Sequence, residues 1–109
     1  MIYSLKYTDD LPAGFNGWAW LWHIKIRPAY SDDIGLLEHE KVHVKQFWRL
    51  GTLHAYLYWL SKRYRLKCEV EAYREQLKYG GDIDLFAKFI SEKYDLKITI
   101  EDARRKLGD

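Results

Sequence analysis

The sequence predicts an α+β fold in which a small N-terminal antiparallel sheet or hairpin packs against a set of helices. Two observations predict it: strand-like alternation of apolar and polar residues is confined to the first 27 residues, and helical spacing dominates from Ile34 onward. The chain has 109 residues, of which 48% are hydrophobic and 31% charged. That length supports one hydrophobic core, so we expect a single domain over residues 1–109.

Two strands are predicted near the N-terminus. The first covers Ile2 to Tyr7 and is followed by turn-forming residues at Asp9-Asp10 and Pro12-Ala13-Gly14. The second covers Trp18 to Arg27, where large apolar side chains alternate with smaller or polar ones. This alternation predicts a buried face made of Trp18, Trp20, Trp22, Ile24 and Ile26.

A long helix is predicted from Ile34 to Leu50, because apolar residues recur there at helical spacing. Ser31, Asp32 and Asp33 offer an N-cap, and Gly51 offers a C-terminal stop. Four further helices are predicted at about residues 53–62, 66–78, 85–94 and 100–107. Thr99 is the expected cap of the last one.

Charge and cysteine content exclude several classes of protein. The 18 basic and 16 acidic side chains give a net charge of +2 and are spread along the chain, so we expect neither a nucleic-acid nor a membrane partner. Cys68 is the sole cysteine and cannot form an internal disulfide. Without a signal peptide or an apolar run long enough to span a bilayer, the expected location is cytoplasmic. Composition leaves the oligomeric state open.

The most informative segment is His39-Glu40-Lys41-Val42-His43, on the predicted long helix. Histidines four residues apart project from one helix face, so both imidazoles can bind one metal ion. Glu40 is placed to approach a water on that ion and take its proton as a general base. The alternative is that both histidines are ordinary half-buried residues and that Glu40 pairs with a lysine at the surface.

A catalytic zinc ion needs a third protein ligand. Glu69 and Glu71 lie on a later predicted helix, and because they are two residues apart they point to different faces, so one of them is expected to bind. On an unbroken helix His54 would lie about 16 Å from the second histidine, and only a sharp turn at Gly51 would bring it closer. Cys68 is another candidate, although sites with two histidines are more often completed by a carboxylate.

The segment from Leu37 to Gln46, followed by Glu69 to Tyr73, resembles the small gluzincin-type (HExxH) zinc metallopeptidases, including minimal versions from bacteria and phages. The likeness spans roughly residues 1–80. It implies a zincin-like helix that binds one Zn²⁺ per chain through His39, His43 and Glu69. It also implies that Glu40 is the general base in peptide-bond hydrolysis.

One residue departs from the pattern of that family. Tyr73 stands where the family usually has an Asp that holds a ligand histidine by a hydrogen bond. Tyr73 itself or another acid, such as Glu71, would have to replace that contact. The choice of Glu69 over Glu71 as the third ligand therefore stays open at this point.

The resemblance further implies a peptide or protein substrate. An extended peptide would bind by backbone pairing to the strand predicted at Trp18 to Arg27, for which an ordinary core strand is the alternative. Because the chain is much shorter than most zinc peptidases, a second hypothesis is a zinc-binding protein that is latent or non-proteolytic. A third is a helical interaction module without metal.

Overall fold

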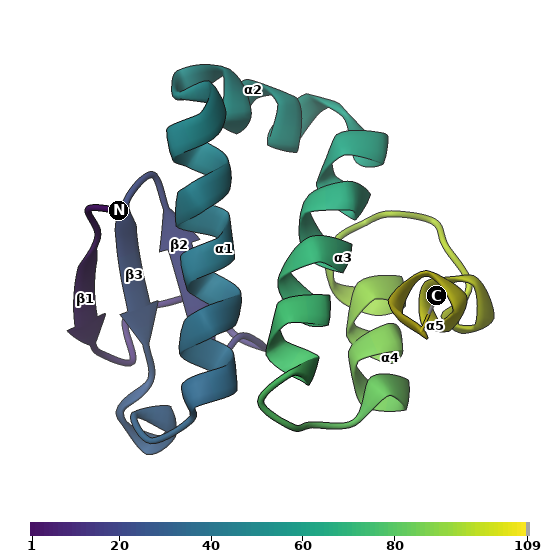
Figure 1. The fold of residues 1–109 in the computed structure, drawn as a ribbon, viewed down its shortest axis with the longest axis horizontal. Coiled ribbons are helices and arrows are strands. Elements are labelled where there is room, and N and C mark those ends of the chain that lie inside the picture. Colours follow the sequence, from purple (N-terminus) through teal and green to yellow (C-terminus); the bar gives the residue numbers. More distant parts are fainter. Residues whose placement is uncertain (109) are drawn as a thin grey trace.

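The computed structural model describes residues 1–108 and has the predicted α+β architecture. Three short strands form a sheet at one side of the molecule: β1 (Ser4–Tyr7), β2 (Gly17–Trp20) and β3 (His23–Ile26). The long helix α1 (Ile34–Leu50) lies beside the sheet, and the remaining helices lie on the other side of α1 (Figure 1). The prediction of strands first and helices after is confirmed.

The sheet is mixed, which corrects the expectation of an antiparallel one. Its strand order is β1-β3-β2, with β2 antiparallel and β1 parallel to β3. The tight turn between β2 and β3 gives β2 one edge of β3, so β1 has to pair with the other edge. The connection over residues 8–16 then crosses the sheet, which leaves β2 as an edge strand.

The segment from Trp18 to Arg27 is a hairpin and not the single strand that we predicted. Its two-residue loop is Leu21-Trp22, where Leu21 has a φ of 56°. Such a loop usually carries Gly, Asn or Asp, so nothing in the alternation revealed it. Ile24 and Ile26 are 1% exposed, but Trp20 is 49% exposed. The predicted buried face is therefore correct only in part: its two isoleucines are fully buried and Trp22 packs against them half-buried, whereas Trp20 is exposed.

Helix α1 has the bounds that the sequence predicted. The Asp33 side chain accepts a hydrogen bond from the Leu36 backbone N–H (3.0 Å), which caps the first turn. One face of α1 packs on the sheet, where fully buried Val44 meets Ile24 and Ile26. Another face packs on α3 (Lys62–Leu77), so α1 lies between the sheet and the helical layer.

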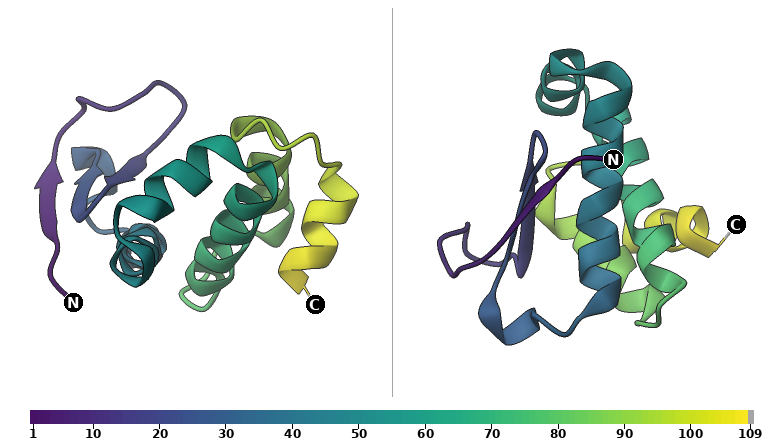
Figure 2. Two further views of the ribbon diagram at one scale, coloured as in Figure 1. Left: turned by 90° about the horizontal axis from the view of Figure 1, so that it is seen from above. Right: turned by 60° about the vertical axis from the view of Figure 1, so that its left-hand side comes forward.

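The other elements are a 3-10 turn (Pro28–Tyr30), α2 (Thr52–Leu60), α4 (Ile83–Lys93) and α5 (Ile100–Gly108). Helix α3 begins before the predicted residue 66, because the Ser61 side chain caps it by accepting from the Tyr64 N–H. A second core joins α3, α4 and α5 (Figure 2); its buried members are Tyr73, Phe86, Ala87, Ile90, Leu96, Ala103 and Leu107. No described helix has the length and apolarity needed to cross a bilayer.

Helix α2 bridges the ends of α1 and α3 (Figure 1). Gly51, with a φ of 61°, allows the sharp turn that starts it. The buried Arg65 fixes its other end by donating to the carbonyl oxygen of Tyr58 (2.6 Å) and, across the molecule, to those of Tyr94 (2.9 Å) and Asp95 (3.4 Å). Arg65 therefore ties the end of α2 to the connection between α4 and α5.

Candidate metal centre

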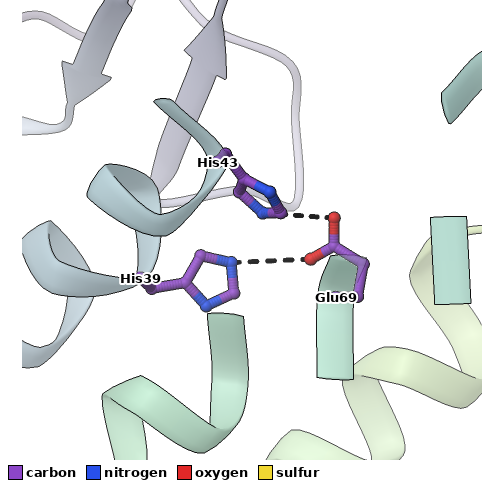
Figure 3. A group of neighbouring side chains, drawn as sticks. All are labelled: His39, His43 and Glu69. Atoms are coloured by element: carbon purple, nitrogen blue, oxygen red, sulfur yellow. Dashed lines mark ion pairs between the residues drawn. The ribbon is translucent and has the colours of Figure 1, made fainter. Parts of the chain in front are cut away.

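Three of the predicted site residues meet between α1 and α3. His39 and His43 project from α1 toward Glu69 on α3 (Figure 3). His39 Nε2 lies 3.5 Å from Glu69 Oε1, and His43 Nε2 lies 3.2 Å from Glu69 Oε2. His39 is 4% and Glu69 1% exposed. The structure thus brings two imidazoles and one carboxylate together, with His39 and Glu69 buried and His43 half-buried.

The donor set and its spacing fit a zinc ion. One ligand atom from each of the three residues lies within 4.8 Å of the other two. Zinc ligands at about 2.0–2.2 Å in a tetrahedron lie roughly 3.4 Å from one another, close to the distances found here. Among the described residues, Glu69 Oε1 is also one of the few buried side-chain atoms without a hydrogen-bond partner. A cation between the imidazoles would satisfy that oxygen.

The surroundings of Glu69 and His43 strongly perturb the ionisation of these two side chains. Burial by itself raises the pKa of Glu69, but the neighbouring His43 and His39 outweigh it and hold that pKa well below the usual range. Burial disfavours the charged form of His43, but its attraction to Glu69, together with hydrogen bonds, raises its pKa from 6.5 to about 9. In the metal-free protein, the proton on His43 supplies positive charge where a metal ion could bind.

We expect the stability of the metal-free protein to fall at alkaline pH. The raised pKa of His43 contributes stability that is fully present below pH 6.5 and is lost as pH rises through about 9. The lowered pKa of Glu69 contributes stability that is present above pH 4.5 and is lost as pH falls. Urea unfolding in chelator should therefore show a free energy of unfolding about 3 kcal/mol lower near pH 10 than near pH 6.

The Glu69→Gln variant is the control for this pH dependence. Without the Glu69 charge, His43 loses the main cause of its raised pKa, so the alkaline decrease in stability should largely disappear. Burial also raises the pKa of Glu40 above its usual value of 4.5, so Glu40, like His43, lowers the stability of the native chain as pH rises. Stability that increases between pH 6 and 10 would contradict this account of the site.

Glu40 lies beside the cluster without being part of it. It is 5% exposed, and its Oε2 is 4.0 Å from His39 Nε2. Burial raises the pKa of Glu40, an effect that His39 and His43 partly offset and Glu69 reinforces. The backbone of Gly17 on β2 leaves the room for this carboxylate, because a Cβ at Gly17 would lie 2.9 Å from Glu40 Oε2. A buried carboxylate with a raised pKa next to a metal site is suited to move protons.

A chain of hydrogen bonds holds the His43 ring in place. Because the Gln46 amide nitrogen donates to Glu71 Oε1 (2.8 Å) and to the Cys68 carbonyl (3.1 Å), its oxygen is the acceptor for His43 Nδ1 (2.9 Å). This bond leaves His43 Nε2 facing Glu69. Glu71 in turn pairs with Arg49 (3.0 Å). Glu71 is therefore not a member of the cluster and contacts the ligand histidine only through Gln46.

Two tyrosines support the other ligands. The hydroxyl of Tyr58, on α2, donates to Glu69 Oε2 (2.5 Å). The ring of Tyr73 packs edge-on against His39, with centroids 4.3 Å apart. The Tyr73 hydroxyl bonds that of Tyr94 (2.7 Å), so Tyr73 orients His39 by packing and not through the hydrogen bond that an Asp would make.

The other candidate ligands lie outside the cluster. The turn at Gly51 brings His54 into a cleft that the three cluster residues also line. The Nδ1 of His54, however, bonds the Tyr64 hydroxyl (2.8 Å), and His54 is not in the metal-ligand group. Burial raises the pKa of the Cys68 thiol to about 12, and the thiol is not in the group either. The group that could bind a metal within residues 1–108 is therefore His39, His43 and Glu69.

A cleft runs from the cluster along β2 and under α2. Its larger side chains are Phe15, Trp18, Trp20, Tyr58, Trp59 and Tyr94. In the hairpin, Trp20 and His23 flank the two-residue loop as a hydrogen-bonded pair, and the Arg27 N–H bonds the Asn16 carbonyl at the far end. In an antiparallel pair, hydrogen-bonded and non-hydrogen-bonded positions alternate along the strand. Gly17 and Ala19 occupy non-hydrogen-bonded positions, so their backbone N–H and C=O groups point away from β3, and both residues line the cleft.

Sequence analysis missed three residues of the site. Gln46 was detectable, because it lies three residues after His43 and so shares its helix face. Tyr58 and Gly17 were not, since their roles depend on how α2 and β2 pack against α1.

No protein-family model matches the chain, and no curated protein or solved structure matches it significantly. A functional inference therefore rests on the geometry and chemistry of the cleft.

Proposed function

We propose that the chain is a zinc-dependent metallopeptidase that hydrolyses peptide bonds in the cleft beside β2. One observation carries the proposal: a buried cluster of two histidines and one glutamate, His39, His43 and Glu69, lies next to a second buried carboxylate, Glu40. A cluster that only held a metal would have no need of the additional buried carboxylate, which is costly to desolvate. In a hydrolase the Glu40 carboxylate would serve as the general base.

The proposed chemistry assigns proton transfer to Glu40. A zinc ion held by the three ligands would lower the pKa of water and polarise the substrate carbonyl. The Glu40 carboxylate accepts a proton from the attacking water as the C–O bond forms. It then donates that proton to the amide nitrogen as the C–N bond breaks, which releases an amine and a carboxylic acid. The raised pKa of Glu40 makes its carboxylate a stronger base toward the attacking water.

The proposed substrate is an extended peptide. The backbone N–H and C=O groups of Ala19, which point away from β3, can pair with a peptide that adds to the edge of the sheet. Such a peptide would pass the metal cluster, because Gly17 contacts the Glu40 carboxylate. Main-chain pairing of this kind would position the scissile carbonyl near the zinc ligands and Glu40.

The proposal is tested by zinc content and zinc-dependent cleavage. The purified chain should contain about one zinc per chain and cleave an unfolded protein substrate. Chelator should abolish the cleavage and added zinc should restore it. Bound zinc without cleavage of a broad set of peptides would overturn the peptidase proposal in favour of a latent or non-proteolytic zinc protein. Failure to bind zinc would overturn both.

We expect the Gly17→Ala substitution to impair catalysis while the zinc stays bound. The new methyl group would lie 2.9 Å from Glu40 Oε2 and 3.1 Å from Leu36 Cδ1, so the Glu40 carboxylate has to move. Displacing a catalytic group by about 1 Å costs up to about a hundredfold in rate. Steady-state kinetics and zinc analysis should show a lower kcat with one zinc per chain. An unchanged kcat would contradict the contact between Gly17 and Glu40.

A further inference from the structure

Two large indole side chains line the cleft and yet stay in contact with solvent. Trp20, on β2, is 49% exposed, and Trp59, on α2, is 64% exposed. An exposed tryptophan leaves much apolar surface in water, a cost that a bound apolar group would remove. Two such residues from different elements around one cleft indicate a binding surface for an apolar group.

We propose that Trp20 and Trp59 bind a bulky apolar side chain of the substrate, so that the cleft selects extended peptides with an aromatic or large aliphatic residue near the cleaved bond. This inference rests on the proposed function, since it names the substrate class of the same site. The other large side chains of the wall agree with it: Phe15 contacts Trp18 edge-on with centroids 5.2 Å apart and Tyr94 at 5.9 Å.

The charges around the cleft favour a neutral side chain over a charged one. None of the described lining residues is Lys or Arg, and His39 and His43 are assigned to the metal, so away from the cluster an acidic substrate side chain would find no cationic side chain other than His54. The carboxylates in the lining are Glu40 and Glu69, and both are assigned to the metal cluster and its chemistry. A charged substrate side chain in this cleft would lose its hydration without compensation.

Both tryptophans stand on backbone that is held in place. Trp20 pairs with His23 at the end of the hairpin. The Trp59 carbonyl accepts a hydrogen bond from Arg65 (3.3 Å), next to the Arg65 bond to Tyr58. Anchoring groups on a fixed backbone lose less conformational entropy when a ligand binds. The pair is therefore suited to confer selectivity and not only general apolar attraction.

The test measures selectivity of the zinc-loaded full chain on a peptide library in which each position around the cleaved bond is varied. We expect the wild type to prefer Phe over Ala at one position by about tenfold or more, and to disfavour Glu there. Trp20→Ala and Trp59→Ala should each reduce the ratio of kcat/KM for the Phe and Ala peptides by about tenfold. Tyr56→Ala is the matched control, because Tyr56 is 66% exposed on α2 but does not line the cleft.

A binding measurement separates this inference from the proposed function. The zinc-loaded Glu40→Gln variant is titrated with uncleaved Phe-, Ala- and Glu-containing peptides, with tryptophan fluorescence as the readout. Tighter binding of the Phe peptide, lost in Trp20→Ala and Trp59→Ala, supports the selectivity even if the wild type cleaves nothing. Cleavage without preference for apolar residues, or a preference that survives both substitutions, overturns the selectivity while the peptidase function stands.

Discussion

Replacing Glu40 with Gln should abolish peptide hydrolysis while leaving one zinc bound per chain. Gln has nearly the shape of Glu but cannot accept the proton of the attacking water, so the expected loss in kcat is about 10²- to 10⁴-fold. Zinc should remain, because Glu40 is not in the ligand group of His39, His43 and Glu69. Steady-state kinetics and elemental analysis on the same preparation measure both quantities.

Glu38→Gln is the matched control for this substitution. Glu38 lies on the same helix and pairs with Lys41 (3.2 Å), outside the residues that line the cleft. Its replacement should change neither zinc content nor kcat appreciably, since an ion pair between residues three apart on one helix contributes little. A Glu40→Gln variant that retained the activity of the wild type would remove Glu40 from the chemistry. A loss of zinc would instead make Glu40 part of the metal site.

The second large effect is expected from Glu69→Ala, which should lose both zinc and activity. Two histidines alone bind zinc much more weakly than two histidines with a carboxylate. Glu71→Ala should keep its zinc, because Glu71 reaches the site only through Gln46 and its loss is expected to weaken zinc binding by no more than about 10- to 100-fold. Dialysis against zinc-free buffer followed by elemental analysis compares the two variants.

The pair of variants also decides between the two glutamates. Zinc lost from Glu71→Ala and kept by Glu69→Ala would reverse the ligand assignment. Zinc kept by both would require a different third ligand, with His54 as the nearest alternative in the cleft. Circular dichroism on each variant controls for unfolding, which matters because Glu69 is 1% exposed.

The long helix and the shared face of His39 and His43 could be predicted because their signals are local. Asp33 and Gly51 mark the ends of α1 by their own capping chemistry, and the spacing of His39 and His43 places both on one face. The structure places Glu69, and not Glu71, beside the histidines for a less local reason. A helix that packs on α1 can direct only one of two alternate residues toward the histidines.

What could not be predicted depends on packing between distant elements. The Leu21-Trp22 turn has none of the usual turn residues, so the hairpin was read as one strand and the exposure of Trp20 was missed. The parallel pairing of β1 follows from the path of the chain around β3. The contact of Tyr58 with Glu69 depends on the direction that α2 takes after Gly51, which the spacing of residues does not give.

The buried Arg65 connects the C-terminal part of the chain to the candidate metal site, although none of the three cluster residues comes from that part. The cluster is borne by α1 and α3 alone, whereas the position of Tyr58 depends through Arg65 on carbonyls of Tyr94 and Asp95. Tyr58 in turn donates to Glu69, so changes in the connection after α4 reach the cluster through Arg65 and Tyr58 although that connection lies outside it.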